Sequence, residues 1–387
     1  MVDPPRLRTI EVDEGERRAT WMELFFDLVF VVAVAQVANI LSADPSWRGL
    51  LRFGGLFIPI WWAWMGYTFY ANRFDTDDVV HRLFYLAGML AVAALAITVH
   101  DALHGGSAEF AVAYLAVRIV LIGLYVRARR HVARARGLTN VFLAAFGASA
   151  LLWLVSVFVP TPGRYGIWAA ALVLELVAPM AAWRLVSEAP VHRTHLPERF
   201  GLFTLIVLGE SVLGVILGTV DVSWHWESVA VALAGFLIAA SIWWVYFDFF
   251  DTGAVLGRGV FRGLAYTYGH FPLVAGIVVA GVGTKLAIQD AAHNPHGSGT
   301  LWVICIGIAA AMLALGAIHW IGAGRRTDLD LFLRLAAAAG AGILAGFSSS
   351  LGAVVIVWLL AALLLAVTLV ELVGHEAHHE AASVGPL

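Results

Sequence analysis

Long apolar stretches separated by short polar breaks run along almost the whole chain. Each stretch holds about 20 residues, the length that an α-helix needs to cross the hydrocarbon core of a bilayer. Turn-forming residues mark the breaks, as at Pro160–Gly163. The pattern predicts an all-α integral membrane protein with about 12 transmembrane helices. The predicted spans are 21–41, 53–71, 80–100, 108–127, 138–159, 165–187, 199–219, 228–249, 260–283, 299–321, 329–348 and 350–372.

Several short motifs recur in the second half of the chain. Trp61-Trp62 returns as Trp243-Trp244, and Phe74-Asp75 returns as Phe250-Asp251, at offsets of about 180 residues. Six spans per half predict a parallel 6+6 pseudo-repeat, an arrangement found in many secondary transporters. Chance similarity between apolar helices is the alternative. The expected parts are an N-terminal tail at 1–20, a first six-helix half at 21–187, a linker at 188–198, a second half at 199–372 and a His-rich C-terminal tail at 373–387.

Composition and charge fit the same class. Of the 387 residues, 61% are hydrophobic and 13% are charged, and the single cysteine, Cys305, excludes an internal disulfide. Arginines concentrate in the even-numbered loops, so the positive-inside rule places these loops, the linker and both tails in the cytoplasm. Orientation and contact with anionic lipid explain the basic segment Arg127–Arg136. We therefore expect membrane lipids as partners and no nucleic acid.

Five segments resemble the low-temperature-requirement A (LtrA) family of bacterial multi-pass membrane proteins. They are ELFFDLVFV at 23–31, NRFD at 72–75, HLPERF at 195–200 with LGES at 208–211, WWVYFD at 243–248 and YGHFP at 268–272. The final three spans carry no such segment. The resemblance implies a multi-pass protein of the bacterial cytoplasmic (inner) membrane. The family name refers to growth in the cold and supplies no reaction.

Two acids lie at the start of the first span, one helical turn apart. Glu23 and Asp27 are at i and i+4, so both project from one face of the helix, with Asp27 roughly 10 Å inside its cytoplasmic end. A carboxylate at that depth costs several kcal/mol, so it needs a partner or a function. The expected partners are the arginines at the cytoplasmic ends of other spans, namely Arg73, Arg82, Arg199 and Arg262.

Acids and arginines gather at the cytoplasmic ends of helices in both halves. One interpretation is a gate whose ion pairs break and re-form during alternating access. The other is static pairing that lowers the cost of buried charge and fixes helix register. The predicted cluster contains Glu23, Asp27, Arg73, Asp75, Arg82, Glu198, Arg199, Asp248, Asp251 and Arg262.

A second set of polar residues lies near the bilayer midplane. Glu210 and His270 are each about halfway along their spans, and a carboxyl beside a histidine in a low dielectric suits proton coupling. Tyr268 and Ser211 adjoin them and complete the candidate site for substrate or proton coupling. A hydrogen-bonded packing role is the alternative for His270.

The first half contains a midplane pair of its own. Arg118 and Glu175 lie near the middle of the fourth and sixth spans, where opposite charges lower each other's cost. We expect this pair to be structural, with a functional role as the alternative.

No metal or cofactor site is predicted. His100 and His104 have the spacing of a zinc pair, but the sequence supplies no third ligand. The predicted function is a secondary transporter of a small solute or ion, possibly coupled to protons. Two alternatives are an intramembrane enzyme acting on a lipid or lipid-linked substrate, and a channel or a non-catalytic membrane scaffold or sensor. An enzyme is the less favoured class.

Overall fold

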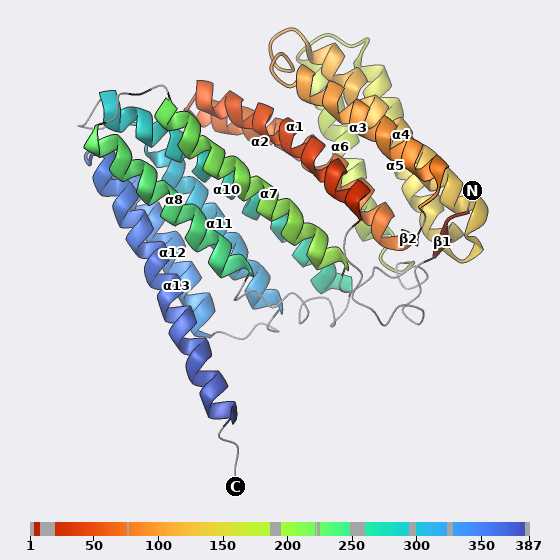
Figure 1. Cartoon of the computed structure of the whole chain (residues 1–387). Coiled ribbons are helices and arrows are strands. Elements are labelled where there is room, and N and C mark those ends of the chain that lie inside the picture. The colour runs from red at the N-terminus through yellow and green to blue at the C-terminus, as the bar shows by residue number, and fades with distance from the viewer. Residues whose placement is uncertain are drawn as a thin grey trace. The chain divides into compact units, whose positions relative to one another are not determined.

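Twelve α-helices account for nearly all of the described chain (Figure 1). The computed structural model describes residues 4–7, 20–75, 77–185, 195–220, 222, 225–247, 260–293, 299–322 and 328–383. The helices are α1 (Trp21–Ala43), α2 (Trp47–Arg73), α3 (Val79–Thr98), α4 (Ser107–His131), α5 (Arg136–Ser156), α6 (Gly163–Ala181), α7 (His195–Val220), α8 (Trp226–Phe247), α10 (Val260–His293), α11 (Trp302–Gly322), α12 (Leu329–Gly346) and α13 (Ala353–Ser383). A 3-10 turn, η1 (Ala133–Ala135), precedes α5.

The prediction of an all-α membrane protein is confirmed. Eleven of the helices in the described part of the chain are long and apolar enough to cross a membrane. Helix α2 has a lower mean hydropathy than these eleven because it is rich in tryptophan, tyrosine and glycine. Every residue of the chain from 59 to 74 is nonetheless buried. A helix surrounded by protein needs no uniformly aliphatic surface, which explains the lower hydropathy of α2.

Some boundaries differ from the predicted ones. Helix α7 begins at His195, so the last four residues of the predicted linker at 188–198 are helical. Helix α13 extends to Ser383, well into the predicted tail at 373–387. Apolar runs locate helices well, but they do not mark where a helix leaves the membrane.

The helices form two compact units. Unit 1 comprises Met1–Ile40 and Leu50–Phe203, and unit 2 comprises Leu41–Gly49 and Thr204–Leu387. In unit 1, α3, α4, α5 and α6 pack in sequence order. In unit 2, α10, α11, α12 and α13 also pack in sequence order, and α8 packs against α10 and α13. The 6+6 pseudo-repeat stays a prediction.

A short strand pair holds part of the N-terminal segment. Strand β1 (Arg6–Leu7) pairs antiparallel with β2 (Phe74–Asp75), which follows α2 directly. Arg6 lies opposite Asp75, and Leu7 lies opposite Phe74. The predicted tail at 1–20 therefore includes one segment that is bound to the end of α2.

Side-chain caps fix the starts of three helices. Thr20 and Glu23 form a capping box at α1, with the Glu23 amide donating to Thr20 Oγ1 at 3.2 Å and the Thr20 amide donating to Glu23 Oε2 at 2.8 Å. Asp78 accepts a hydrogen bond from the His81 amide at the start of α3, and Asp328 accepts one from the Leu331 amide at the start of α12, each at 2.9 Å.

Glycines allow α10 and α11 to approach closely. A Cβ at Gly307 would lie 2.3 Å from the Ala280 nitrogen, and a Cβ at Gly283 would lie 2.3 Å from the Ile304 nitrogen. Helices in lipid associate through van der Waals contact, which small residues make possible. The packing of unit 2 therefore depends on these glycines.

Replacing Gly307 tests this dependence. We expect Gly307→Ala to lower stability by about 1–3 kcal/mol because its Cβ overlaps the α10 backbone. Gly342→Ala in α12 is the matched control, since no atom lies within 4 Å of its Cβ position. The control should be neutral or more stable by up to about 1 kcal/mol. Thermal unfolding in detergent measures both, and equal effects would contradict the packing argument.

The cap of α3 predicts a pH dependence. Burial raises the pKa of Asp78, but hydrogen bonds from the His81 amide and the Arg127 guanidinium outweigh it, so the net pKa is lowered. A lowered carboxyl pKa stabilises the fold above the unfolded pKa of about 4, and this stabilisation is lost as the pH falls through the folded value.

Asn is also a good N-cap, so Asp78→Asn removes the ion pair to Arg127 and keeps the cap. Asp78→Asn should melt below the wild type at pH 7, and the difference should shrink below about pH 4. Asp77→Asn is the control because Asp77 pairs with Arg82 at the exposed surface. A difference in melting temperature for Asp78→Asn that is independent of pH would contradict the assignment.

Candidate functional site

Two acids of α1 are buried within unit 1 and bound by other helices. Asp27 is 0% exposed, and its Oδ1 accepts hydrogen bonds from Arg199 Nη2 at 2.6 Å and from Trp64 Nε1 at 2.8 Å. Glu23 is 4% exposed, and its Oε1 lies 3.8 Å from Arg199 Nη1. Arg199 thus faces both acids from the first turns of α7.

A histidine and an amide extend this group. His195, the first residue of α7, has its Nε2 atom 3.5 Å from Glu23 Oε2. Its Nδ1 atom lies 3.3 Å from Asn72 Nδ2 on α2. With the Asn72 amide nitrogen as donor, His195 Nδ1 accepts, and the proton of a neutral ring then lies on Nε2, facing Glu23. We call Glu23, Asp27, Trp64, Asn72, His195 and Arg199 the carboxylate cluster.

The carboxylate cluster is unevenly charged and incompletely hydrogen-bonded. Its two carboxylates outnumber its one guanidinium, and the remaining titratable member is His195. Asp27 Oδ2 and the Nε and Nη1 atoms of Arg199 are buried without a hydrogen-bond partner among the described residues. Two further groups lie close by: His81 of α3 near Glu23, and Glu198 near Arg199. Such a group has spare capacity for a proton or a hydrogen-bonding ligand.

Two of the partners expected for Glu23 and Asp27 have other contacts. Arg82 forms an ion pair with Asp77 at 2.9 Å on an exposed surface, because it lies one residue beyond the buried face of α3. The Arg73 guanidinium lies over the rings of Phe69 and Phe142, 5.1 and 5.8 Å from their centroids. Of the four expected arginines, the structure shows Arg199 bound to these acids.

The structure describes only some of the other residues predicted for the charge cluster. The Asp75 backbone pairs with Arg6, and its side chain is outside the described part. Asp248 and Asp251 also lie outside the described residues. Arg262, at the start of α10 in unit 2, is half-buried. The gate joining the two halves stays a prediction.

Arg118 and Glu175 are brought together in the middle of unit 1. Both side chains are fully buried, and the Arg118 guanidinium contacts both Glu175 and the Tyr114 hydroxyl. Glu175 also accepts hydrogen bonds from Tyr114 at 2.8 Å and Ser149 at 2.5 Å. This group joins α4, α5 and α6, and it balances one positive against one negative charge.

Glu210 and His270 have separate neighbours in unit 2. Glu210 is half-buried on α7, and the cation acting on it is Lys285 of α10. His270 is fully buried, with Nδ1 2.7 Å from the Tyr266 carbonyl oxygen and Nε2 3.0 Å from the Tyr246 hydroxyl. Because a carbonyl only accepts, Nδ1 carries a proton and Nε2 is left to accept from Tyr246 when the ring is neutral. This fits a packing histidine.

The remaining residues of that predicted site are also placed. Tyr268 is half-buried on α10. The Ser211 hydroxyl donates to the Ile277 carbonyl at 3.3 Å and lines a cavity of about 10 Å³ between α7, α8 and α10. That volume holds about one water molecule. Neither Glu210 nor His270 lines this cavity.

Sequence reasoning missed a third buried pair. Arg334 of α12 and Glu371 of α13 lie 3.2 Å apart, and both side chains are fully buried. Arg334 shares its span with Asp330, and Glu371 lies at the end of its predicted span, so neither gave the midspan signal that identified Arg118 and Glu175. Nearby, His319, Asp328 and Asp330 place ligand-type atoms within 4.8 Å of one another. Asp328 caps α12 and also pairs with His319 at 2.8 Å, so these contacts account for two of the three residues.

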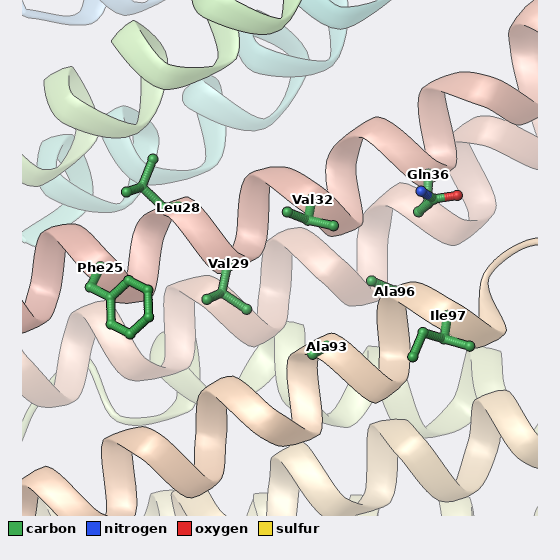
Figure 2. A pocket seen from close by; sticks show the side chains of 8 residues that line it. All are labelled: Phe25, Leu28, Val29, Val32, Gln36, Ala93, Ala96 and Ile97. Carbon is green, nitrogen blue, oxygen red and sulfur yellow. The ribbon is translucent and has the colours of Figure 1, made fainter.

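A groove of about 650 Å³ runs between α1 and α3 in unit 1 (Figure 2). Figure 2 shows Phe25 and Val29 pointing from α1 toward α3. Gln36 supplies the one polar side chain, and the lining residues are Phe25, Leu28, Val29, Val32, Gln36, Ala93, Ala96 and Ile97. Glu23 and Asp27 are about 200° from Phe25 around the helix, so they do not line the groove.

The helices and their buried ion pairs define a polytopic all-α membrane protein. The chain belongs to the family described as bacterial low temperature requirement A protein (LtrA), which it matches over residues 18–370. It is also 31% identical over 328 residues to the uncharacterized protein RA0937 of Rhizobium meliloti (strain 1021), covering 79% of this chain and 77% of the relative. The family resemblance read from the sequence is confirmed.

The balanced pair predicts a strong coupling between its members. Arg118→Met or Glu175→Met alone should cost about 3–5 kcal/mol because each leaves one buried charge without its partner. The double variant should recover most of that loss, since it removes both charges. A double-mutant cycle on thermal unfolding in detergent measures the coupling. Additive losses would contradict a direct ion pair.

Proposed function

We propose that this LtrA-family protein is a secondary transporter of a small solute or ion. Its cycle includes the uptake and release of one proton at the carboxylate cluster. The observation that carries the proposal is the uneven charge of that cluster at the start of a membrane-spanning helix. Glu23 and Asp27 face a single guanidinium, that of Arg199.

One proton is the simplest way to balance this charge. A guanidinium stays protonated in proteins, so Arg199 cannot adjust the charge. His195 and the two carboxylates can, and one proton shared among them makes the four groups neutral. Net charge is costly at membrane depth, so the cluster favours either that proton or exposure to water. These two conditions correspond to the two states of a proton-coupled cycle.

The other buried pairs offer a contrast. Arg118–Glu175 and Arg334–Glu371 each match one charge with one charge. They need no proton to be neutral, which suits a static role in helix packing. The carboxylate cluster differs from both in its charge, because two carboxylates face one guanidinium.

The position of Arg199 links the cluster to a helix that both units share. Arg199 lies in the part of α7 assigned to unit 1, and α7 continues into unit 2 from Thr204. A change in the Asp27–Arg199 ion pair would therefore act on this helix, as alternating access requires of a coupling site. The groove in Figure 2 excludes both acids, so it gives no support to lipid chemistry at Glu23 and Asp27.

Asp27→Asn and Glu23→Gln test the coupling in proteoliposomes that contain a pH-sensitive dye. A panel of amino acids, monosaccharides and inorganic cations is applied across the membrane, and proton movement is followed. We expect the wild type to move protons with at least one solute. Both variants should slow that movement at least tenfold, since each removes a proton-binding carboxylate (about 1.4 kcal/mol or more).

Asp77→Asn is the control, because Asp77 pairs with Arg82 at the exposed surface and its loss leaves no buried charge unpaired. It should couple at the wild-type rate. Wild-type coupling in Asp27→Asn and Glu23→Gln would exclude the cluster as the proton site. Loss of coupling in Glu210→Gln alone would assign the proton to the midplane acid instead. If the protein moves no solute in the panel and the liposome lipids are chemically altered, the result would favour an enzyme.

A further inference from the structure

Four arginines at one end of unit 1 have no carboxylate partner among the described residues. Arg129 and Arg130 end α4, Arg134 lies in η1 and Arg136 begins α5. All four are exposed. Their described contacts are neutral: Arg129 Nε donates to Asn140 Oδ1 at 2.5 Å, and Arg136 Nε donates to the Arg129 carbonyl at 3.4 Å. We call these four residues the arginine patch.

Nearby arginines are neutralised within the protein. Arg127 binds Asp78 at 2.7 Å, and Arg82 binds Asp77 at 2.9 Å. Both acids precede α3, which packs against α4. The chain between 126 and 140 contains no acid, so the arginine patch keeps its full positive charge. Favourable contact with the negative end of α4 explains residues in its last turn, but it does not explain Arg134 and Arg136.

The start of α5 adds a second feature that favours an anion. Its N-cap residue is Ala135, and no side chain caps this end of the helix. The Arg136 amide donates to the Ala133 carbonyl of η1, so what this end of the helix offers an anion is the partial positive charge of the helix dipole. Helix α5 has 21 residues, so its dipole is fully developed. Arg134 and Arg136 lie at this end of the helix, and Arg136 contacts the Arg129 carbonyl.

We propose that the arginine patch binds the phosphate headgroup of an anionic phospholipid. Helices α4 and α5 are both long and apolar enough to span the membrane, so their ends lie at the depth of lipid headgroups. Nucleic acid is a poorer fit because the segment 126–140 contains no Phe, Tyr or Trp on which bases could stack. The proposal is independent of the transport function proposed above.

The test measures lipid binding to the purified full-length protein in a non-ionic detergent. Phosphatidylglycerol and phosphatidylcholine are added at equal concentrations, and the bound lipids are counted by native mass spectrometry. The wild type should bind phosphatidylglycerol more tightly, and added salt should weaken that binding. Replacing all four arginines by Gln should weaken it at least tenfold, since each arginine near a headgroup is worth about fivefold. Phosphatidylcholine binding should not change.

Two control variants separate charge from fold. Replacing the same four arginines by Lys should retain most of the preference for phosphatidylglycerol. Arg82→Gln removes a surface arginine that Asp77 already neutralises, so it should bind lipid like the wild type. Equal binding of the two lipids by the wild type would overturn the proposal, as would full retention of the preference in the Gln variant.

Two further outcomes would also overturn it. The first is a lower melting temperature of the Gln variant in lipid-free detergent, which would assign the arginines a structural role. The second is wild-type binding of a single-stranded oligonucleotide that phosphatidylglycerol does not displace. An unchanged melting temperature and displacement of the oligonucleotide by the lipid are the results that we expect.

Discussion

Charge buried in a medium of low dielectric needs an opposite charge close by, and this constraint organises the described helices. Each fully buried arginine with an acid partner binds an acid of a different helix: α7 to α1, α4 to α6, and α12 to α13. Separating such partners costs several kcal/mol, whereas apolar contacts between helices in lipid allow sliding and rotation. The ion pairs therefore specify which helices are neighbours and in which register, and close contact at small residues completes the packing.

The helices were predictable because a membrane span satisfies its backbone hydrogen bonds internally and displays its apolar length in the sequence. Helix rotation was less predictable. Arg82 and Asp27 both lie near the cytoplasmic ends of their helices in the predicted topology, which suggested that they meet. Arg82 instead lies on the exposed face of α3, and its neighbour His81 lies on the buried face. A rotation of about 100° separates adjacent residues, and apolar composition alone does not determine it when both faces are hydrophobic.

The candidate site was also only partly predictable from the sequence. Arg118 and Glu175 could be paired because each was the one charge at the centre of its span, whereas Arg334 and Glu371 lie near the ends of theirs and gave no such signal. His195 was harder to predict, since the sequence does not show that α7 begins there or that Asn72 directs its ring toward Glu23. Glu210 and His270 lie at similar depth, but depth does not establish contact between helices.

The complete burial of residues 59–74 has a consequence for how the protein is made. Helix α2 is too polar and aromatic to rank with the other spans in hydropathy. A segment of this kind partitions weakly into lipid when it leaves the translocon by itself. Its residence in the bilayer then depends on partners from its own chain, including α1 before it and α4 after it, whose Val117 carbonyl accepts the Tyr67 hydroxyl at 3.1 Å. Membrane insertion and folding are thus one coupled process for this part of the chain.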